Sequence, residues 1–142
     1  MLQVKHLLAE KGSQVHAIGA DDPVLAAIQT MADHYVGALL VMRGDELVGI
    51  VSERDYARKI VLKGRSSSAT PVRDIMTAPV ITIGPTDTVD TCMRLCTDSR
   101  VRHLPVVEGG KVVGIVSIGD LVKAVISEQS VQIEQLQRYI AG

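Results

Sequence analysis

The feature of this sequence that most restricts its fold is an internal repeat. Residues 47–55 read LVGIVSERD, and residues 112–120 read VVGIVSIGD, a shift of 65 positions. The same shift aligns further glycine, aspartate and apolar positions over about 40 residues, which is hard to obtain by chance. The chain is therefore predicted to contain two copies of one supersecondary unit, each of which needs the other to complete its core.

Each repeat has the sequence pattern of a β-α-β-β-α unit. Its first helix is expected to begin at an aspartate N-cap, Asp22 in one copy and Asp87 in the other, because a carboxylate there accepts a backbone hydrogen bond. Its second helix is expected to begin at Ser52 or Ser117. The other predicted elements are extended segments over 16–18 and 80–83, hairpins over 38–51 and 104–116, and flanking helices over 2–10 and 128–140.

These elements predict an α/β fold of the α+β type, in which the two repeats pack about a pseudo-twofold axis. The expected organisation has an N-terminal helix and repeat 1 in residues 1–63, and a small, polar linker in 64–71. Repeat 2 then occupies 72–127, and a helical tail occupies 128–142.

The composition argues against nucleic-acid and membrane binding. The net charge is −1, and the only aromatic residues besides histidine are three tyrosines, so basic surfaces and stacking platforms are scarce. The longest apolar run, residues 36–42, is far too short to cross a bilayer. The N-terminus also lacks the charged and apolar regions of a secretory signal, and we expect a cytoplasmic protein.

Neither a metal site nor a catalytic site is expected. Cys92 and Cys96 extend an apolar helical stripe and have no second Cys or His pair nearby, which favours core packing. Ser117, His103 and Asp120 contain the residue types of a catalytic triad, but no motif orders them as one. The sequence also lacks a phosphate-binding loop with lysine, so we expect no enzymatic activity and no catalytic cofactor.

The repeated motifs resemble those of a tandem pair of CBS domains, also called a Bateman module. The resemblance covers roughly residues 4–126 and rests on GIVSERD at 49–55, GIVSIGD at 114–120, RHLPVV at 102–107 and DIMT at 74–77. Similar modules regulate enzymes, channels and transporters, and this chain is similar to the free-standing bacterial members. The resemblance implies a ligand such as AMP, ADP, ATP, NAD or S-adenosylmethionine, held in two clefts between the repeats.

The Ser-x-x-Asp sequences have two compatible interpretations. Serine and aspartate at this spacing form a capping box at a helix N-terminus. An acidic side chain at such a position can also accept hydrogen bonds from a ribose diol. The resemblance implies the ribose role for Asp55 and Asp120. Gly49 and Gly114, which lie within strands, indicate close approach either of a ligand or of the protein's own packing.

The resemblance further implies that each cleft takes residues from both repeats. The cleft of Asp120 would include Gln14, Val15 and His16, whereas that of Asp55 would include Thr77, Pro79 and Val80. Arg54, Arg102 and His103 would supply positive charge for phosphates at the Asp55 cleft, whereas Arg58 and Lys59 are expected on a solvated helix face. The full set of predicted nucleotide-binding residues is Gln14, Val15, His16, Ser52, Arg54, Asp55, Thr77, Pro79, Val80, Arg102, His103, Ser117 and Asp120.

The two clefts are not expected to be equivalent, because repeat 1 has Gly37, Ala38 and Leu40 where repeat 2 has Arg102, His103 and Pro105. Gly119 also stands where repeat 1 has Arg54. The predicted function is a regulatory module that binds an adenine nucleotide and acts on an unidentified effector protein. Such a module is expected to be a homodimer, joined by the apolar faces of the helices that begin at Ser52 and Ser117. The alternative is a dimerisation or interaction module whose clefts are empty.

Overall fold

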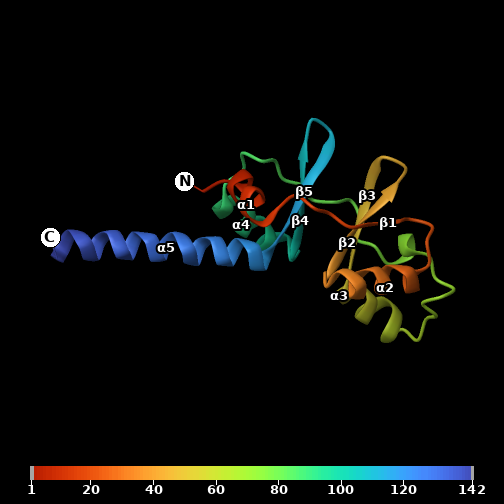
Figure 1. Ribbon diagram of the computed structural model, residues 1–142. Helices are drawn as coiled ribbons and strands as arrows, with labels where there is room; N and C mark the ends of the chain where they lie inside the picture. Colours follow the sequence, from red (N-terminus) through yellow and green to blue (C-terminus); the bar gives the residue numbers. More distant parts are fainter. Residues whose placement is uncertain (1, 142) are drawn as a thin grey trace. The chain divides into compact units, whose positions relative to one another are not determined.

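The computed structural model describes residues 2–141, which form two compact units (Figure 1). The first unit consists of residues 14–81, and the second joins the N-terminal segment to residues 82–141. The helices and strands of the first unit are β1 (Ala17–Gly19), α2 (Val24–His34), β2 (Ala38–Arg43), β3 (Glu46–Ser52), α3 (Glu53–Tyr56), η1 (Ala57–Val61) and η2 (Val72–Asp74). Those of the second are α1 (Val4–Lys11), α4 (Val89–Ser99), β4 (His103–Glu108), β5 (Lys111–Ser117) and α5 (Ile118–Ala141).

The grouping of the flanking segments differs from the expected domain boundaries. The N-terminal helix was placed with repeat 1, but the backbone N–H groups of Val4 and Lys5 donate to the carbonyls of Asp87 and Pro85 in the second unit. Conversely, the N–H of Val72 donates to the carbonyl of Asp22, which holds residues 72–81 in the first unit. Each repeat is thus completed by a segment that lies before or after it in the sequence.

The predicted hairpins are confirmed, and they have the same register in both repeats. Strand β2 pairs antiparallel with β3, as β4 does with β5, and both ladders shift register at equivalent positions. Strand β1 lies parallel to β2 and completes a three-stranded sheet. The equivalent extended segment of repeat 2 is shorter than predicted, because only Ile83 forms a bridge, to Val106.

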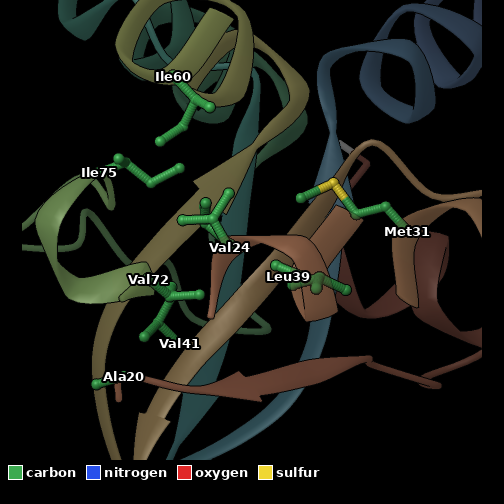
Figure 2. Packing of buried hydrophobic residues seen from close by; sticks show 10 residues of the cluster. Ala20, Val24, Met31, Leu39, Val41, Ile60, Val72 and Ile75 are labelled. Atoms are coloured by element: carbon green, nitrogen blue, oxygen red, sulfur yellow. The ribbon is translucent and has the colours of Figure 1, made fainter. Parts of the chain in front are cut away.

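The core of the first unit lies where α2 and residues 72–75 pack on the three-stranded sheet (Figure 2). Val24 and Met31 come from α2, Leu39 and Val41 from β2, and all four are nearly or fully buried. Ile60, Val72 and Ile75 complete the same cluster. The C-terminal end of the expected linker packs against this core. Thr70 is 5% exposed, and its carbonyl accepts a hydrogen bond from the N–H of Val24.

The N-caps of the first helices lie one residue later than predicted. Pro23 and Thr88 occupy the caps of α2 and α4, and the Thr88 hydroxyl accepts a hydrogen bond from the N–H of Thr91. Asp22 and Asp87 instead accept hydrogen bonds from the backbone N–H of the residue three positions earlier, Gly19 or Gly84. The aspartates therefore close the turn that precedes each helix, and their carboxylates do not cap the helix itself.

Cys92 and Cys96 are free and buried in α4, as the core interpretation predicted. Burial raises the pKa of the Cys92 thiol to about 11, an effect to which the negative charges of Asp87 and Cys96 add. Among residues 2–141 no group of His, Cys, Asp and Glu side chains has the arrangement of a metal site. Over the same range no helix is long and apolar enough to cross a membrane.

The predicted C-terminal helix is present, but it is continuous with the second helix of repeat 2. The resulting α5 has 24 residues. Only Leu121 is fully buried, and every residue from 126 to 141 is exposed. Residues 128–140 therefore form the predicted helix, and they are exposed within the described chain.

Candidate functional site

Both Ser-x-x-Asp sequences form reciprocal capping boxes. The N–H of Asp55 donates to the Ser52 hydroxyl, and the N–H of Ser52 donates to Asp55 Oδ2 at 3.0 Å. In repeat 2 the N–H of Asp120 donates to the Ser117 hydroxyl, and the N–H of Ser117 donates to Asp120 Oδ2 at 2.8 Å. The capping interpretation is confirmed, and it places an acidic side chain at the start of each helix in a fixed orientation.

Asp55 also meets a lysine and a threonine of the first unit. Lys59 Nζ lies 3.4 Å from Asp55 Oδ1 and donates to the carbonyl of Ile75. The Thr77 hydroxyl lies 3.5 Å from the same carboxylate oxygen, as expected from the predicted neighbourhood of Asp55 and Thr77. Lys59 is 43% exposed, as a solvated face predicts, but its ammonium group also joins the helical segment to residues 72–77.

Asp120 has a different cation. Lys11, at the end of α1, donates to Asp120 Oδ2 at 2.6 Å and to the carbonyl of Ile115 at 2.8 Å. Burial raises the pKa of the Asp120 carboxyl, but the hydrogen bonds from Lys11 and Ser117 and the positive charge of Lys11 outweigh it and lower the pKa overall. No sequence signal pointed to Lys11, because 109 positions separate it from Asp120.

A groove of about 600 Å³ lies between α1 and α5 and includes this ion pair. Leu2, Leu7 and Val131 contribute apolar surface, whereas Lys11 and Asp120 contribute opposite charges. Its volume falls in the range of small-molecule sites, roughly 300–1,000 Å³, and its lining mixes apolar area with a few polar groups. This groove could not be predicted from the sequence, because α1 was expected to belong with the other repeat.

The other predicted site residues fall into the two units. Gln14, Val15 and His16 precede β1, and the His16 ring stacks on that of His34 with centroids 3.9 Å apart. Pro79 is exposed, Val80 is half-buried, and the Arg54 side chain is exposed next to Asp55. Asp55 and Thr77 thus lie together in the first unit, and Arg54 precedes Asp55 in the sequence.

Arg102 and His103, which the resemblance assigns to the Asp55 cleft, lie in the second unit. There the carbonyl of Arg102 accepts from the N–H of Ile118, and His103 pairs with Ser117 across the β4–β5 ladder. Their backbone therefore lies directly beside the capping box of Asp120. This follows from the hairpin register, which returns β5 to the start of β4.

Gly49 and Gly114 permit close packing within each unit. A Cβ at Gly49 would overlap the side chain of Met76, and one at Gly114 would lie 2.6 Å from Leu8 Cδ2. The packing interpretation of these glycines therefore holds, and α1 covers β5 as the segment around Met76 covers β3. These contacts also bring Lys11 and Thr77 to the two carboxylates.

Comparison with known proteins assigns both repeats to one family. The CBS domain model matches residues 7–62 and 72–127. The mitochondrial CBS domain-containing protein CBSX3 of Arabidopsis thaliana is 46% identical over 127 residues, which are 86% of this chain and 62% of that protein. The chain thus spans less than two-thirds of the length of that relative.

Solved structures agree with this assignment. A protein with CBS domains from Burkholderia ambifaria MC40-6, described as a signal-transduction protein, is 51% identical, with a TM-score of 0.86 over 89% of this chain and 96% of that one. A hexameric CBS-CP12 protein from bloom-forming cyanobacteria is 27% identical, with a TM-score of 0.78 over 86% of this chain and 70% of that one. The chain belongs to the CBS domain family and contains two CBS domains.

Proposed function

We propose that this chain is a non-catalytic regulatory module that binds an adenine nucleotide at Asp55 and Asp120. The observation that carries the proposal is the repeated arrangement at the two capping boxes. In each, a carboxylate is fixed at a helix start and a lysine ammonium group lies within 3.4 Å of it. A carboxylate suits a ribose diol, and a mobile cation suits a phosphate.

The lysines are placed to change partners when a ligand binds. The side chains of Lys11 and Lys59 are 34% and 43% exposed, so each ammonium group can turn toward a phosphate. The ribose hydroxyls would then replace the ammonium as donors to the carboxylate. In the second unit the groove between α1 and α5 offers apolar surface for a base next to Asp120.

The two sites are proposed to differ in their dependence on phosphate. At the Asp55 site Lys59 is in contact with the carboxylate, and Arg54 is exposed one position before Asp55 in the same helix. At the Asp120 site Gly119 stands in place of that arginine, which leaves Lys11 as the cation in direct contact. Because charge-assisted hydrogen bonds are about twice as strong as neutral ones, the Asp55 site should gain more from each phosphate.

The proposal is tested by calorimetric titration of adenosine, AMP, ADP, ATP, NAD and S-adenosylmethionine into the parent, Arg54→Ala and Asp120→Ala proteins. Arg54→Ala should weaken AMP and ADP but leave adenosine unchanged, and Asp120→Ala should remove one binding event. Unchanged AMP binding in Arg54→Ala would refute the phosphate assignment. Full stoichiometry and affinity in Asp120→Ala would refute the ribose role.

A second candidate function is a dimerisation or interaction module that binds no nucleotide. It is favoured by the fact that both carboxylates already have an ammonium partner within the chain. A thermal-shift screen separates the two functions, because a ligand at about 100 times its dissociation constant adds roughly 2.7 kcal/mol to stability. No shift with any adenine nucleotide would favour this second function.

We also propose that the module is a homodimer, in line with the hexameric assembly of the cyanobacterial relative. Apolar side chains that a monomer leaves in solvent support this, namely Val61 and Leu62 after α3 and Val122 and Ile126 on α5. Sedimentation velocity at tens of micromolar protein tests the proposal, and a monomer at that concentration would contradict it.

A further inference from the structure

A regular stripe of exposed side chains runs along α5 beyond the part that packs on its own unit. Its members follow one another at alternating intervals of four and three residues: Val122, Ile126, Gln129, Ile133, Leu136 and Ile140. The five apolar members are between 41% and 76% exposed. Alternating intervals of three and four are the heptad pattern of a coiled-coil seam, in which the apolar positions are called a and d.

The stripe is separate from the face by which α5 packs in its unit. Leu121 is fully buried, and Ala124 and Val125 are half-buried, whereas Val122 and Ile126 beside them are exposed. In Figure 1 the C-terminal half of α5 extends beyond the other elements of the second unit. Nothing in the described part of the unit therefore covers the stripe.

The residue types indicate what covers it. The a positions are Ile126, Ile133 and Ile140, and the d positions are Val122, Gln129 and Leu136. In parallel coiled coils, β-branched residues at a favour two strands when leucine occupies d. The polar Gln129 at another d position can satisfy its amide best against the same amide of an identical helix, which selects one register.

The charge pattern also fits a second copy of the same helix. The positions that flank a coiled-coil seam on either side, called e and g, decide which partners are accepted. In α5 these are Lys123, Val125, Ser130, Gln132, Gln137 and Tyr139, of which only Lys123 is charged. The charged Glu128, Glu134 and Arg138 lie outside the seam, so two identical helices meet without like-charge repulsion.

We propose that two copies of this chain pair through α5 as a parallel, in-register coiled coil, in which Gln129 faces Gln129 of the second copy. The inference rests on the proposed homodimer, specifies its orientation and does not depend on nucleotide binding. The seam is about 27 Å long, which is short for an isolated coiled coil. Its first turn is held by the burial of Leu121, which supplies the anchorage that a free peptide lacks.

Disulfide trapping in the full chain tests the orientation. Gln129→Cys should form a disulfide-linked dimer on mild oxidation, since parallel in-register helices place position 129 opposite itself. Val131→Cys is the matched control, because position 131 is exposed but lies off the seam, and it should give no linked dimer. An antiparallel seam would instead link Gln129→Cys to Ile133→Cys in a mixture of the two variants, and that result would overturn the proposal. The native Cys92 and Cys96 are buried and present in every variant, so the oxidised parent protein gives the background level of linked dimer.

The contribution of the seam is measured with Ile133→Glu and Val131→Glu, since the parent residues are 57% and 52% exposed. The dissociation constant of the dimer, from fluorescence-detected sedimentation over a dilution series, should rise at least about 30-fold for Ile133→Glu, because both copies lose an apolar contact and gain a charge. It should stay within about threefold of the parent for Val131→Glu. A monomeric parent would refute the homodimer itself, whereas a dimeric parent with an unchanged constant in Ile133→Glu would refute only the coiled coil.

Discussion

Lys11→Met removes the ammonium group that joins α1 to the N-terminus of α5 and keeps a side chain of similar length. Lys11 donates to Asp120 Oδ2 at 2.6 Å and to the carbonyl of Ile115 at 2.8 Å. Both acceptors lie in the second unit, at the end of β5 and the start of α5. The substitution therefore leaves the Asp120 carboxylate without its cation and removes both side-chain hydrogen bonds from Lys11 to the β5–α5 segment.

The size of the effect follows from the exposure of the pair. A hydrogen bond to a charged group contributes about 1.5–3 kcal/mol when it is shielded, whereas fully exposed ion pairs contribute about 0.2–1 kcal/mol. The Lys11 and Asp120 side chains are 34% and 28% exposed, so solvent screens part of the interaction. We expect a loss of about 1–2 kcal/mol in the free energy of unfolding, or a fall in Tm of roughly 3–6 °C.

The pH dependence provides a second signature. The pKa of Asp120 is lowered from its ordinary value of 3.8, so the unfolded chain binds the proton more tightly than the folded one. The stabilisation by the pair is therefore complete above that ordinary value, and it is lost as the pH falls through the lowered, folded-state pKa. The unfolding curves of Lys11→Met and the parent should differ most near pH 7 and converge under more acidic conditions.

Urea unfolding monitored by circular dichroism between pH 2.5 and 7.5 measures both effects. Lys123→Met is the control, because it removes an ammonium group from the same groove while the hydrogen bond between Lys11 and Asp120 remains. A double-mutant cycle with Asp120→Asn should assign most of the loss to the pair. A stability change in Lys11→Met no larger than in the control, or one that persists unchanged in acid, would refute the reasoning.

Three further outcomes are expected. Gly114→Ala should destabilise the protein by about 1–3 kcal/mol, because its Cβ would lie 2.6 Å from Leu8 Cδ2. Gly119→Ala is the control. Its Cβ would meet only Ser117 Oγ at 3.5 Å, so the substitution should be neutral or slightly stabilising. Leu39→Ala should cost about 2–5 kcal/mol in urea unfolding, since Leu39 is fully buried in the core of the first unit; a smaller loss would mean that the core closes the cavity. Cys92 should react slowly with a thiol reagent in the native protein at pH 8, and rapid labelling would contradict its burial. The free energy of unfolding should fall as the pH rises from 9.0 to about 11, because in that range the thiol ionises only in the unfolded chain.

Local patterns in the sequence predicted the secondary structure of the repeats well. The hairpins depend on alternating apolar residues around glycine turns, and both formed with equivalent registers. The capping boxes of Ser52 and Ser117 also formed, because their hydrogen bonds join residues only three positions apart. The helix starts at Asp22 and Asp87 were missed by one residue, since a carboxylate can close the preceding turn as readily as it can cap the helix.

The repeat, its strands and helices, and the positions of Asp55 and Asp120 at helix starts were determined by the sequence alone, because they depend on short-range periodicity and hydrogen bonding. Only the tertiary structure decided which flanking segment completes which repeat, and hence that Lys11 of α1 meets the Asp120 carboxylate. Lys59 reaches Asp55 from the same helix, whereas Lys11 reaches Asp120 across 109 positions of sequence. The physical reason is that α1 packs on β5 through contacts such as that of Leu8 with Gly114, and burial of this kind has no sequence period that would reveal its partner.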